Sequence, residues 1–232
     1  TPTLQAKLDQ VNARINRAAG AVSRDPASIC LVAVSKTYPV QAVLEALDAG
    51  QTHFGENYAA EGVSKIEQLR AARPQAAVQW HFIGPIQSNK TRLIAAHYDW
   101  VQSIDRLKIA QRLSEQRPAD AAALNVLIQV NISAEPSKSG VAPDALLDLA
   151  REIAQLPRLR LRGLMAIPQA TAHEPQQREA FAAMQVLFEA TRAVGGPYWD
   201  TLSMGMSADL EAAIAAGSTM VRVGRAIFGE RT

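Results

Sequence analysis

Hydrophobic positions along this 232-residue chain follow two patterns that alternate from one end to the other. Short apolar runs rich in valine and isoleucine, such as 31–34 and 124–132, indicate buried strands. The segments between them repeat apolar residues at helical spacing, which indicates helices with one buried face. Segment 40–47 is an example, because Pro39 precedes it and Gly50 follows it, as expected at the two ends of a helix. The pattern therefore predicts an α/β protein.

Segments of the strand type occur eight times, and a helical segment lies between each one and the next. Their residues are 29–36, 52–58, 78–84, 99–105, 124–132, 159–167, 198–205 and 219–224. Strand–helix alternation predicts a parallel sheet covered by helices, and eight units favour a closed (β/α)8 barrel, or TIM barrel. A doubly wound open sheet is the alternative, but the first strand-to-helix turn, SKTYP, lacks the glycines of a dinucleotide-binding fingerprint.

No segment rich in proline, glycine or serine divides the chain, so we predict one domain over residues 1–232. Only RAIFGERT follows the eighth predicted strand. The first helix ends near Gly20 and carries Leu8, Val11 and Ile15 on one face. We expect it to cover the gap that a missing last helix would leave in the outer ring.

Composition and charge narrow the classes of function. The net charge is only +2 and no long run of Lys or Arg occurs, which argues against nucleic-acid binding. No apolar stretch approaches the ~18 residues of a membrane span, and the charged N-terminal segment does not resemble a signal peptide. The single cysteine, Cys30, excludes an intrachain disulfide and a cysteine-based zinc site, and it suits the reducing cytoplasm. The four histidines show no metal-ligand spacing, so we expect no metal.

Candidate functional residues follow the predicted strands. Active sites of (β/α)8 barrels lie at the carboxyl ends of the strands. Lys36 ends the first strand and Asn57 follows the second. Segment 203–207 follows the seventh strand, and Arg222 and Gly224 end the eighth. Closure of the barrel makes the first and eighth strands neighbours, so we expect Lys36 to lie beside the end of the eighth strand.

Lys36 is the residue that points most directly to chemistry. Lysine is rarely buried, yet Lys36 directly follows a hydrophobic strand. Partial burial and a nearby arginine would both lower the pKa of its amine, and a neutral amine attacks aldehydes to form a Schiff base. The alternative is a solvated lysine that simply ends a strand.

The ends of the seventh and eighth strands resemble a phosphate cradle. Ser207 stands where the N-cap of the helix in SADLEAAIAAG is expected, and neighbouring N–H groups there would bind an anion. Gly224 would let the backbone approach closely, and GRAIFG could open a short helix with free N–H groups. Ordinary capping and a tight turn are the alternative. A Schiff-base lysine and a phosphate cradle on one rim together suggest an aldehyde that bears a phosphate, and pyridoxal 5'-phosphate (PLP) is one such molecule.

Several motifs of the chain resemble those of the pyridoxal phosphate homeostasis protein family, over residues 28–229. They are LVAVSKTYP, HFGENY, WHFIGPIQSNK, LIQVNIS, KSG, LRGLMAIP, LSMGMSADLEAAIAAGSTMVRVG and AIFG. The resemblance implies a TIM barrel of PLP fold type III, like the N-terminal domain of alanine racemase. It also implies PLP held as an internal aldimine on Lys36. The family is known for cofactor homeostasis rather than for a robust enzymatic reaction.

The same resemblance assigns roles to individual residues. Ser207 would offer its hydroxyl to the phosphate, Gly224 and Arg225 would offer backbone N–H groups, and Arg222 would face the pyridine nitrogen. The residues expected to line the pocket are Asn57, Met165, Ser203 and Met204. Lys138 resembles a second family lysine that can take up PLP transiently, although a solvated loop lysine is an equal alternative. The chain departs from the family at Arg225, where Ser or Thr is usual, so a backbone contact would survive there and a hydroxyl contact would not.

An arginine beside the pyridine nitrogen argues against strong catalysis. A guanidinium stays protonated and disfavours the pyridinium, which makes PLP a poor electron sink. Racemases of this barrel type also take a second base from a β-domain after the barrel, for which no residues remain here. We therefore predict a PLP-binding homeostasis protein rather than an enzyme. It would be a cytoplasmic monomer whose partners are PLP and PLP-dependent apo-enzymes. The alternative is an amino-acid racemase or lyase on the same barrel.

Overall fold

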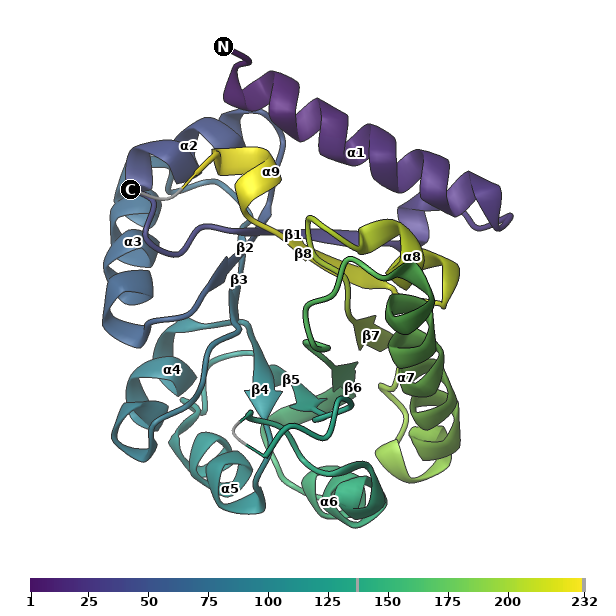
Figure 1. The fold of residues 1–232 in the computed structure, drawn as a ribbon. Coiled ribbons are helices and arrows are strands. Elements are labelled where there is room, and N and C mark those ends of the chain that lie inside the picture. The colour runs from purple at the N-terminus through teal and green to yellow at the C-terminus, as the bar shows by residue number, and fades with distance from the viewer. Residues whose placement is uncertain (137, 231–232) are drawn as a thin grey trace.

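In the computed structural model, which describes residues 1–136 and 138–230, eight parallel strands close into a barrel (Figure 1). The strands are β1 (Cys30–Val34), β2 (His53–Glu56), β3 (Gln79–Phe82), β4 (Trp100–Ile104), β5 (Leu124–Gln129), β6 (Leu159–Met165), β7 (Thr201–Ser203) and β8 (Met220–Val223). Each strand pairs with the next one along the chain, and β1 also pairs with β8, with Val32 opposite Arg222. The predicted barrel is therefore confirmed, and the open-sheet alternative is excluded.

Helices form a ring outside the strands (Figure 1). They are α1 (Leu4–Ala21), α2 (Val40–Asp48), α3 (Ala59–Ala72), α4 (Thr91–His97), α5 (Leu107–Gln116), α6 (Leu146–Ile153), α7 (Glu174–Gly195), α8 (Leu210–Ala215) and α9 (Arg225–Phe228). Short 3₁₀ helices span Pro26–Ser28, Ser88–Lys90 and Pro143–Ala145. The short helix predicted after Gly224 is confirmed as α9. Within the described residues, no helix is both long and apolar enough to cross a membrane.

Side chains along each strand alternate between the barrel interior and the layer beneath the helices, because the side-chain period of a strand is two residues. One buried cluster fills the interior: Val32, Trp100, Leu127, Met165 and Met220. Intervening residues such as Leu31 and Ala33 join the larger cluster between sheet and helices. Continued past the end of β1, this alternation gives Lys36 the same parity as Val32, which is the interior side.

Helix α1 occupies the place in the outer ring next to α8 and α9 (Figure 1). Its buried residues Leu8, Val11 and Ile15 form the predicted apolar face. Arg14 fixes the helix to α8, because its Nε lies 2.7 Å from a carboxylate oxygen of Glu211. The helix thus covers the side of the barrel beside α8 and the short α9. The expected role of the first helix is confirmed.

Candidate functional site

The carboxyl ends of β1, β2, β7 and β8 bring four predicted residues to one rim of the barrel. Lys36 lies two residues beyond β1, and Asn57 directly follows β2. Ser203 is the last residue of β7 rather than part of the loop after it, and Arg222 lies within β8. Because side chains alternate along each strand, the positions of all four residues fall on the interior side of the barrel.

The turn that carries Lys36 is held in an uncommon conformation. Thr37 has φ of 68°, although a β-branched residue disfavours the left-handed region. The backbone N–H of Thr37 donates to Oε1 of Glu61 over 2.6 Å. One residue before Lys36, the carbonyl of Ser35 accepts from Nζ of Lys65 over 2.7 Å. These two contacts from α3 fix the turn on either side of Lys36. Contacts of this kind allow a strained backbone conformation to persist.

A buried ion pair anchors this arrangement. Nζ of Lys65 lies 3.1 Å from Oε2 of Glu56, and the two side chains are 6% and 0% exposed. The hydroxyl of Ser35 donates to the same carboxylate. Burial raises the pKa of Glu56, and the charge of Lys65 acts against that rise. Since the Lys65 ammonium is engaged by Glu56, Glu61 and the Ser35 carbonyl, it serves as a structural cation. This cluster was not predicted from the sequence, in which the four-residue spacing of Glu61 and Lys65 is its only signal.

Tyr38 ties the Lys36 turn to the end of the chain. Its hydroxyl donates to the carbonyl of Gly229, and its ring centroid lies 4.9 Å from that of Phe228. Helix α9 begins at Arg225 with Gly224 as its N-cap, and the first N–H groups of any helix lack intrahelical acceptors. The side chain of Arg225 is exposed. The Lys36 turn therefore packs, through Tyr38, against the end of α9, the helix whose first N–H groups form the candidate anion site.

The predicted capping role of Ser207 is wrong. The N-cap of α8 is Asp209, whose Oδ1 accepts from the N–H of Met206 over 2.7 Å. Ser207 lies two residues earlier in a turn, where its carbonyl accepts from Arg14 Nη2 over 2.9 Å. Serine and aspartate are both favoured caps, and the sequence could not show that the turn at 206–209 would use the aspartate. The hydroxyl of Ser207 stays a candidate phosphate contact.

Arg222 is almost fully buried at the candidate site. Its side chain spans two strand ends: Nη1 donates to Oγ of Ser203 over 2.5 Å, and Nη2 donates to the carbonyl of Ala166 over 2.9 Å. Burial lowers the pKa of Arg222 to about 10, while the charge of Asp209 acts against that shift. The guanidinium therefore stays charged at neutral pH, and it can act only as a donor.

The other predicted residues have different surroundings. Oδ1 of Asn57 is buried without a hydrogen-bond partner in the described structure, so an acceptor is left at the rim. Gly84 is required beside it, because a Cβ there would lie 2.3 Å from the Asn57 carbonyl oxygen. Met165 fills the barrel interior. Met204 packs in the outer cluster, so only its backbone could line the rim. Lys138 is exposed and lies 3.5 Å from a carboxylate oxygen of Glu135.

The polar groups at the rim favour an anionic ligand. Across residues 1–136 and 138–230, no three His, Cys, Asp or Glu side chains are grouped so that they could hold a metal ion. The buried groups at the rim are instead a donor-only arginine, an unpartnered amide oxygen and the first N–H groups of a helix. This set of groups suits an organic anion with several polar atoms better than a cation.

Comparison with known proteins gives a consistent result. The sequence model of the family "Alanine racemase, N-terminal domain" matches residues 6–232. A "Pyridoxal phosphate homeostasis protein" of Vibrio cholerae serotype O1 is 55% identical over 229 residues, which are 99% of this chain and 97% of the relative. The PLP-bound structure of PipY from Synechococcus elongatus PCC7942 has a TM-score of 0.79 and 34% identity, and the match covers 93% of this chain and 100% of PipY.

An alanine racemase from Corynebacterium glutamicum shares the fold with a TM-score of 0.68 at only 18% identity, and the match covers 98% of this chain and 61% of the racemase. Identity at that level shows the architecture alone. The relatives at higher identity match this chain over nearly its whole length, and they carry one name or a bound PLP. The chain belongs to the pyridoxal phosphate homeostasis protein family, and its barrel is an alanine racemase N-terminal domain.

Proposed function

We propose that this protein binds PLP covalently through Lys36 and takes part in PLP homeostasis. The observation that carries the proposal is a lysine turn fixed by α3 on the same rim as a buried donor-only arginine and the first N–H groups of α9. Lys36 would hold PLP through its amine, because an amine condenses with an aldehyde to form a C=N bond and releases the aldehyde oxygen as water. The PLP-bound PipY structure and the names of the curated relatives support the ligand.

The groups at the rim fit the parts of PLP. The N–H groups of Gly224 and Arg225 suit the phosphate, because the start of a helix favours anions. Ser207 adds a hydroxyl within the loop after β7. Arg222 offers a donor to a pyridine nitrogen that carries a lone pair, and Asn57 offers an unpartnered acceptor. Ser203 acts through Arg222, while Met165 and the backbone of Met204 close the inner wall.

The same arginine restrains turnover. Bound PLP supplies an electron sink for carbanions, and that sink is strongest when its pyridine nitrogen is protonated. The Arg222 guanidinium can only donate hydrogen bonds. A pyridine nitrogen that faces it must accept with its lone pair, and so it stays unprotonated. We therefore propose a protein that holds and passes on PLP, with PLP-dependent apo-enzymes as recipients. The monomeric state, the cytoplasmic location and the single domain over 1–232 stay predictions. Racemase or lyase chemistry is the second candidate, favoured only by the shared fold.

Turnover and transfer assays separate these two functions. We expect negligible racemase, decarboxylase and transaminase turnover with the common L- and D-amino acids, alongside transfer of PLP to an apo-enzyme. Chirality, keto-acid formation and the regained activity of the apo-enzyme are the measurements, and free PLP at equal concentration is the control for transfer. A steady rate above about 1 per second that is lost in Lys36→Ala would favour the enzyme instead.

Arg222→Gln is expected to weaken PLP binding and shift the absorption of the bound PLP. The substitution removes a charge-assisted hydrogen bond, which contributes roughly 1.5–3 kcal/mol, so the Kd should rise about tenfold to a hundredfold. Titration with PLP, followed by absorbance, measures both effects, and circular dichroism checks that the barrel still folds. An unchanged Kd together with an unchanged spectrum would place Arg222 outside the site.

A further inference from the structure

We propose that Gln102, His81 and His53 are positioning residues for Arg222. Together with Ser203 they form one directional hydrogen-bond chain through the barrel interior, from the PLP rim to a cavity at the opposite end. This inference rests on the proposed function, because the chain acts on PLP only through Arg222.

The hydrogen-bond chain is continuous and largely buried. Arg222 Nη1 lies 2.5 Å from Ser203 Oγ, and that hydroxyl lies 2.6 Å from Gln102 Oε1. Gln102 Nε2 lies 2.9 Å from His81 Nδ1, and His81 Nε2 lies 3.0 Å from His53 Nδ1. Ser203, Gln102 and His81 are all 0% exposed, and His53 is half-buried. Strands β8, β7, β4, β3 and β2 each contribute one side chain.

Arg222 sets the direction of the first bond, and the orientation of Gln102 sets the direction of the others. A guanidinium can only donate, so Ser203 accepts from it and gives its own hydrogen to the Gln102 carbonyl. The amide nitrogen of Gln102 then faces His81, so Nδ1 of His81 must be the acceptor. His81 consequently carries its hydrogen on Nε2 and donates it to Nδ1 of His53. One orientation of Gln102 and one tautomer of each imidazole satisfy the whole chain.

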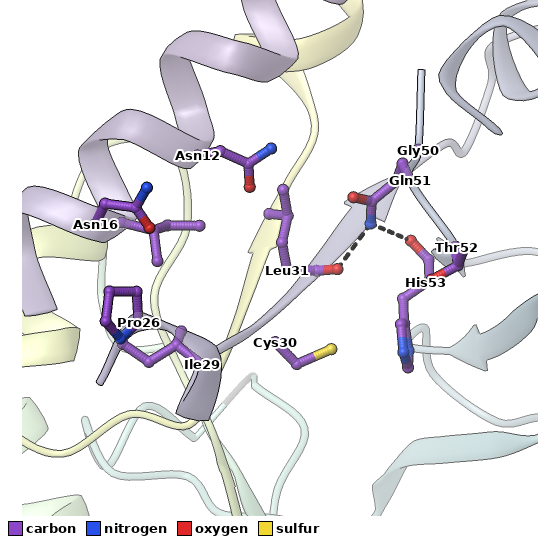
Figure 2. Close-up of a pocket in the computed structure, with 11 residues that line it drawn as sticks. Asn12, Asn16, Pro26, Ile29, Cys30, Leu31, Gly50, Gln51, Thr52 and His53 are labelled. Carbon is purple, nitrogen blue, oxygen red and sulfur yellow. Dashed lines mark hydrogen bonds between the residues drawn. The ribbon is translucent and has the colours of Figure 1, made fainter. Parts of the chain in front are cut away.

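The far end of the chain reaches a cavity of about 360 Å³ at the amino ends of β1 and β2. Figure 2 shows Asn12 and Asn16 of α1 on one side of this cavity and His53 on the other, with the sulfur of Cys30 directed toward the histidine. Gln51 fixes the start of β2 there, because its Nε2 donates to the carbonyls of Leu31 and His53 over 2.7 and 2.8 Å. His53 is therefore the member of the chain most accessible to a proton.

Protonation of His53 would reverse the chain. A protonated His53 donates from Nδ1, so Nε2 of His81 must accept and Nδ1 of His81 must donate. The Gln102 carbonyl would then turn toward His81, and its amide would turn toward Ser203. The Ser203 oxygen would face two donors, Gln102 and Arg222, and its own hydrogen would lose its acceptor. Arg222 Nη1 would then share the Ser203 oxygen with a second donor, and the Ser203 hydroxyl would no longer be oriented by the Gln102 carbonyl, so the contact that fixes Nη1 would weaken.

The electrostatic surroundings set the pH of this reversal. Burial lowers the pKa of His53 below its ordinary value of 6.5. Burial also lowers the pKa of His81 well below that value, and the neighbouring His53 and Arg222 lower it further. Trp100 stacks on His81 without titrating, and burial raises the pKa of Cys30 to about 11, so its thiol stays neutral. The chain is thus intact at neutral pH and is lost as the pH falls below 6.5.

Gln102→Met tests the chain while keeping the shape of the side chain. We expect PLP to bind about threefold to tenfold more weakly at neutral pH, with a shifted absorption band, because Ser203 loses its acceptor. Gln51→Met is the matched control, since it removes two hydrogen bonds of a buried glutamine that point at backbone carbonyls. The control should lose stability while keeping the PLP spectrum. Wild-type spectrum and Kd in Gln102→Met would overturn the proposal.

His53→Asn provides the second test, because its Oδ1 stands near the place of Nδ1 and accepts at every pH. At neutral pH the Kd for PLP should match that of the wild type within about twofold. The wild type should show a rise in Kd below pH 6.5 that His53→Asn lacks. The same acid response in both proteins would overturn the proposal, even if Gln102→Met fails to fold. If the wild type forms no Lys36-linked PLP at neutral pH, the proposed function itself fails, which is a distinct outcome.

Discussion

Lys36→Ala is expected to abolish the covalent, borohydride-reducible form of PLP on this protein. Lys36 has the interior parity of β1 and lies on the rim shared with Arg222, and its turn is fixed by Glu61 and Lys65. An alanine offers no amine, so PLP could bind only through reversible contacts with the phosphate and ring sites. The absorption band of the PLP–lysine linkage should disappear, and mass spectrometry after borohydride reduction should find no modified lysine.

Lys138→Ala is the matched control for this experiment. Lys138 is exposed and paired with Glu135, so its loss should leave the reducible form intact. A reduced adduct found only on Lys138, or on any lysine other than Lys36, would contradict the assignment. Such a result would also restore the alternative in which Lys36 simply ends a strand.

Lys65→Met is expected to destabilise the fold by roughly 3–5 kcal/mol, because it leaves the carboxylate of Glu56 buried without its cation. Glu56 is fully buried, and burial already raises its pKa against the opposing charge of Lys65. Urea denaturation at neutral pH gives the free energy of unfolding. The loss should shrink at acidic pH, because a protonated Glu56 is neutral in both the folded and the unfolded state.

Two further variants separate the buried charge from general damage to α3. Glu56→Gln combined with Lys65→Met removes both charges, so the double variant should be less unstable than the sum of the single changes predicts. Arg73→Met removes an exposed ion pair with Asp48 and should cost only about 0–1 kcal/mol. If Lys65→Met costs no more than Arg73→Met, the buried pair contributes little. Independently of the stability result, PLP binding by the folded Lys65→Met protein reports whether the Lys36 turn is intact.

The barrel could be predicted because strands that are buried on both faces appear in the sequence as continuous apolar runs. Runs such as LVAV and the helices between them fix the number and order of the elements, and the closure of β1 onto β8 then places Lys36 beside the end of β8. The site was predictable only to the level of strand ends. Whether Ser207 or Asp209 capped α8 depended on the turn between them, which both residue types suit.

The buried polar contacts could not be predicted from the sequence pattern. Lys65 meets Glu56 because α3 packs with that lysine inward, against the expectation that lysines face solvent. His81 meets Gln102 through the pairing of β3 with β4, and Gln102 meets Ser203 from the opposite wall of the barrel. The pairs His81–Gln102 and Gln102–Ser203 join residues 21 and 101 positions apart, and the closed register of the barrel brings them together.

The contact of Tyr38 with Gly229 and Phe228 has a consequence for how a ligand leaves. It joins the Lys36 turn to α9, so if α9 binds the phosphate as proposed, a PLP molecule still held there would keep its aldehyde at a high effective concentration near the Lys36 amine. Hydrolysis of the C=N bond would then be followed far more often by recapture than by escape. A recipient enzyme that first loosens α9 would release both ends together, so the exchange rate should depend on the recipient rather than on dilution.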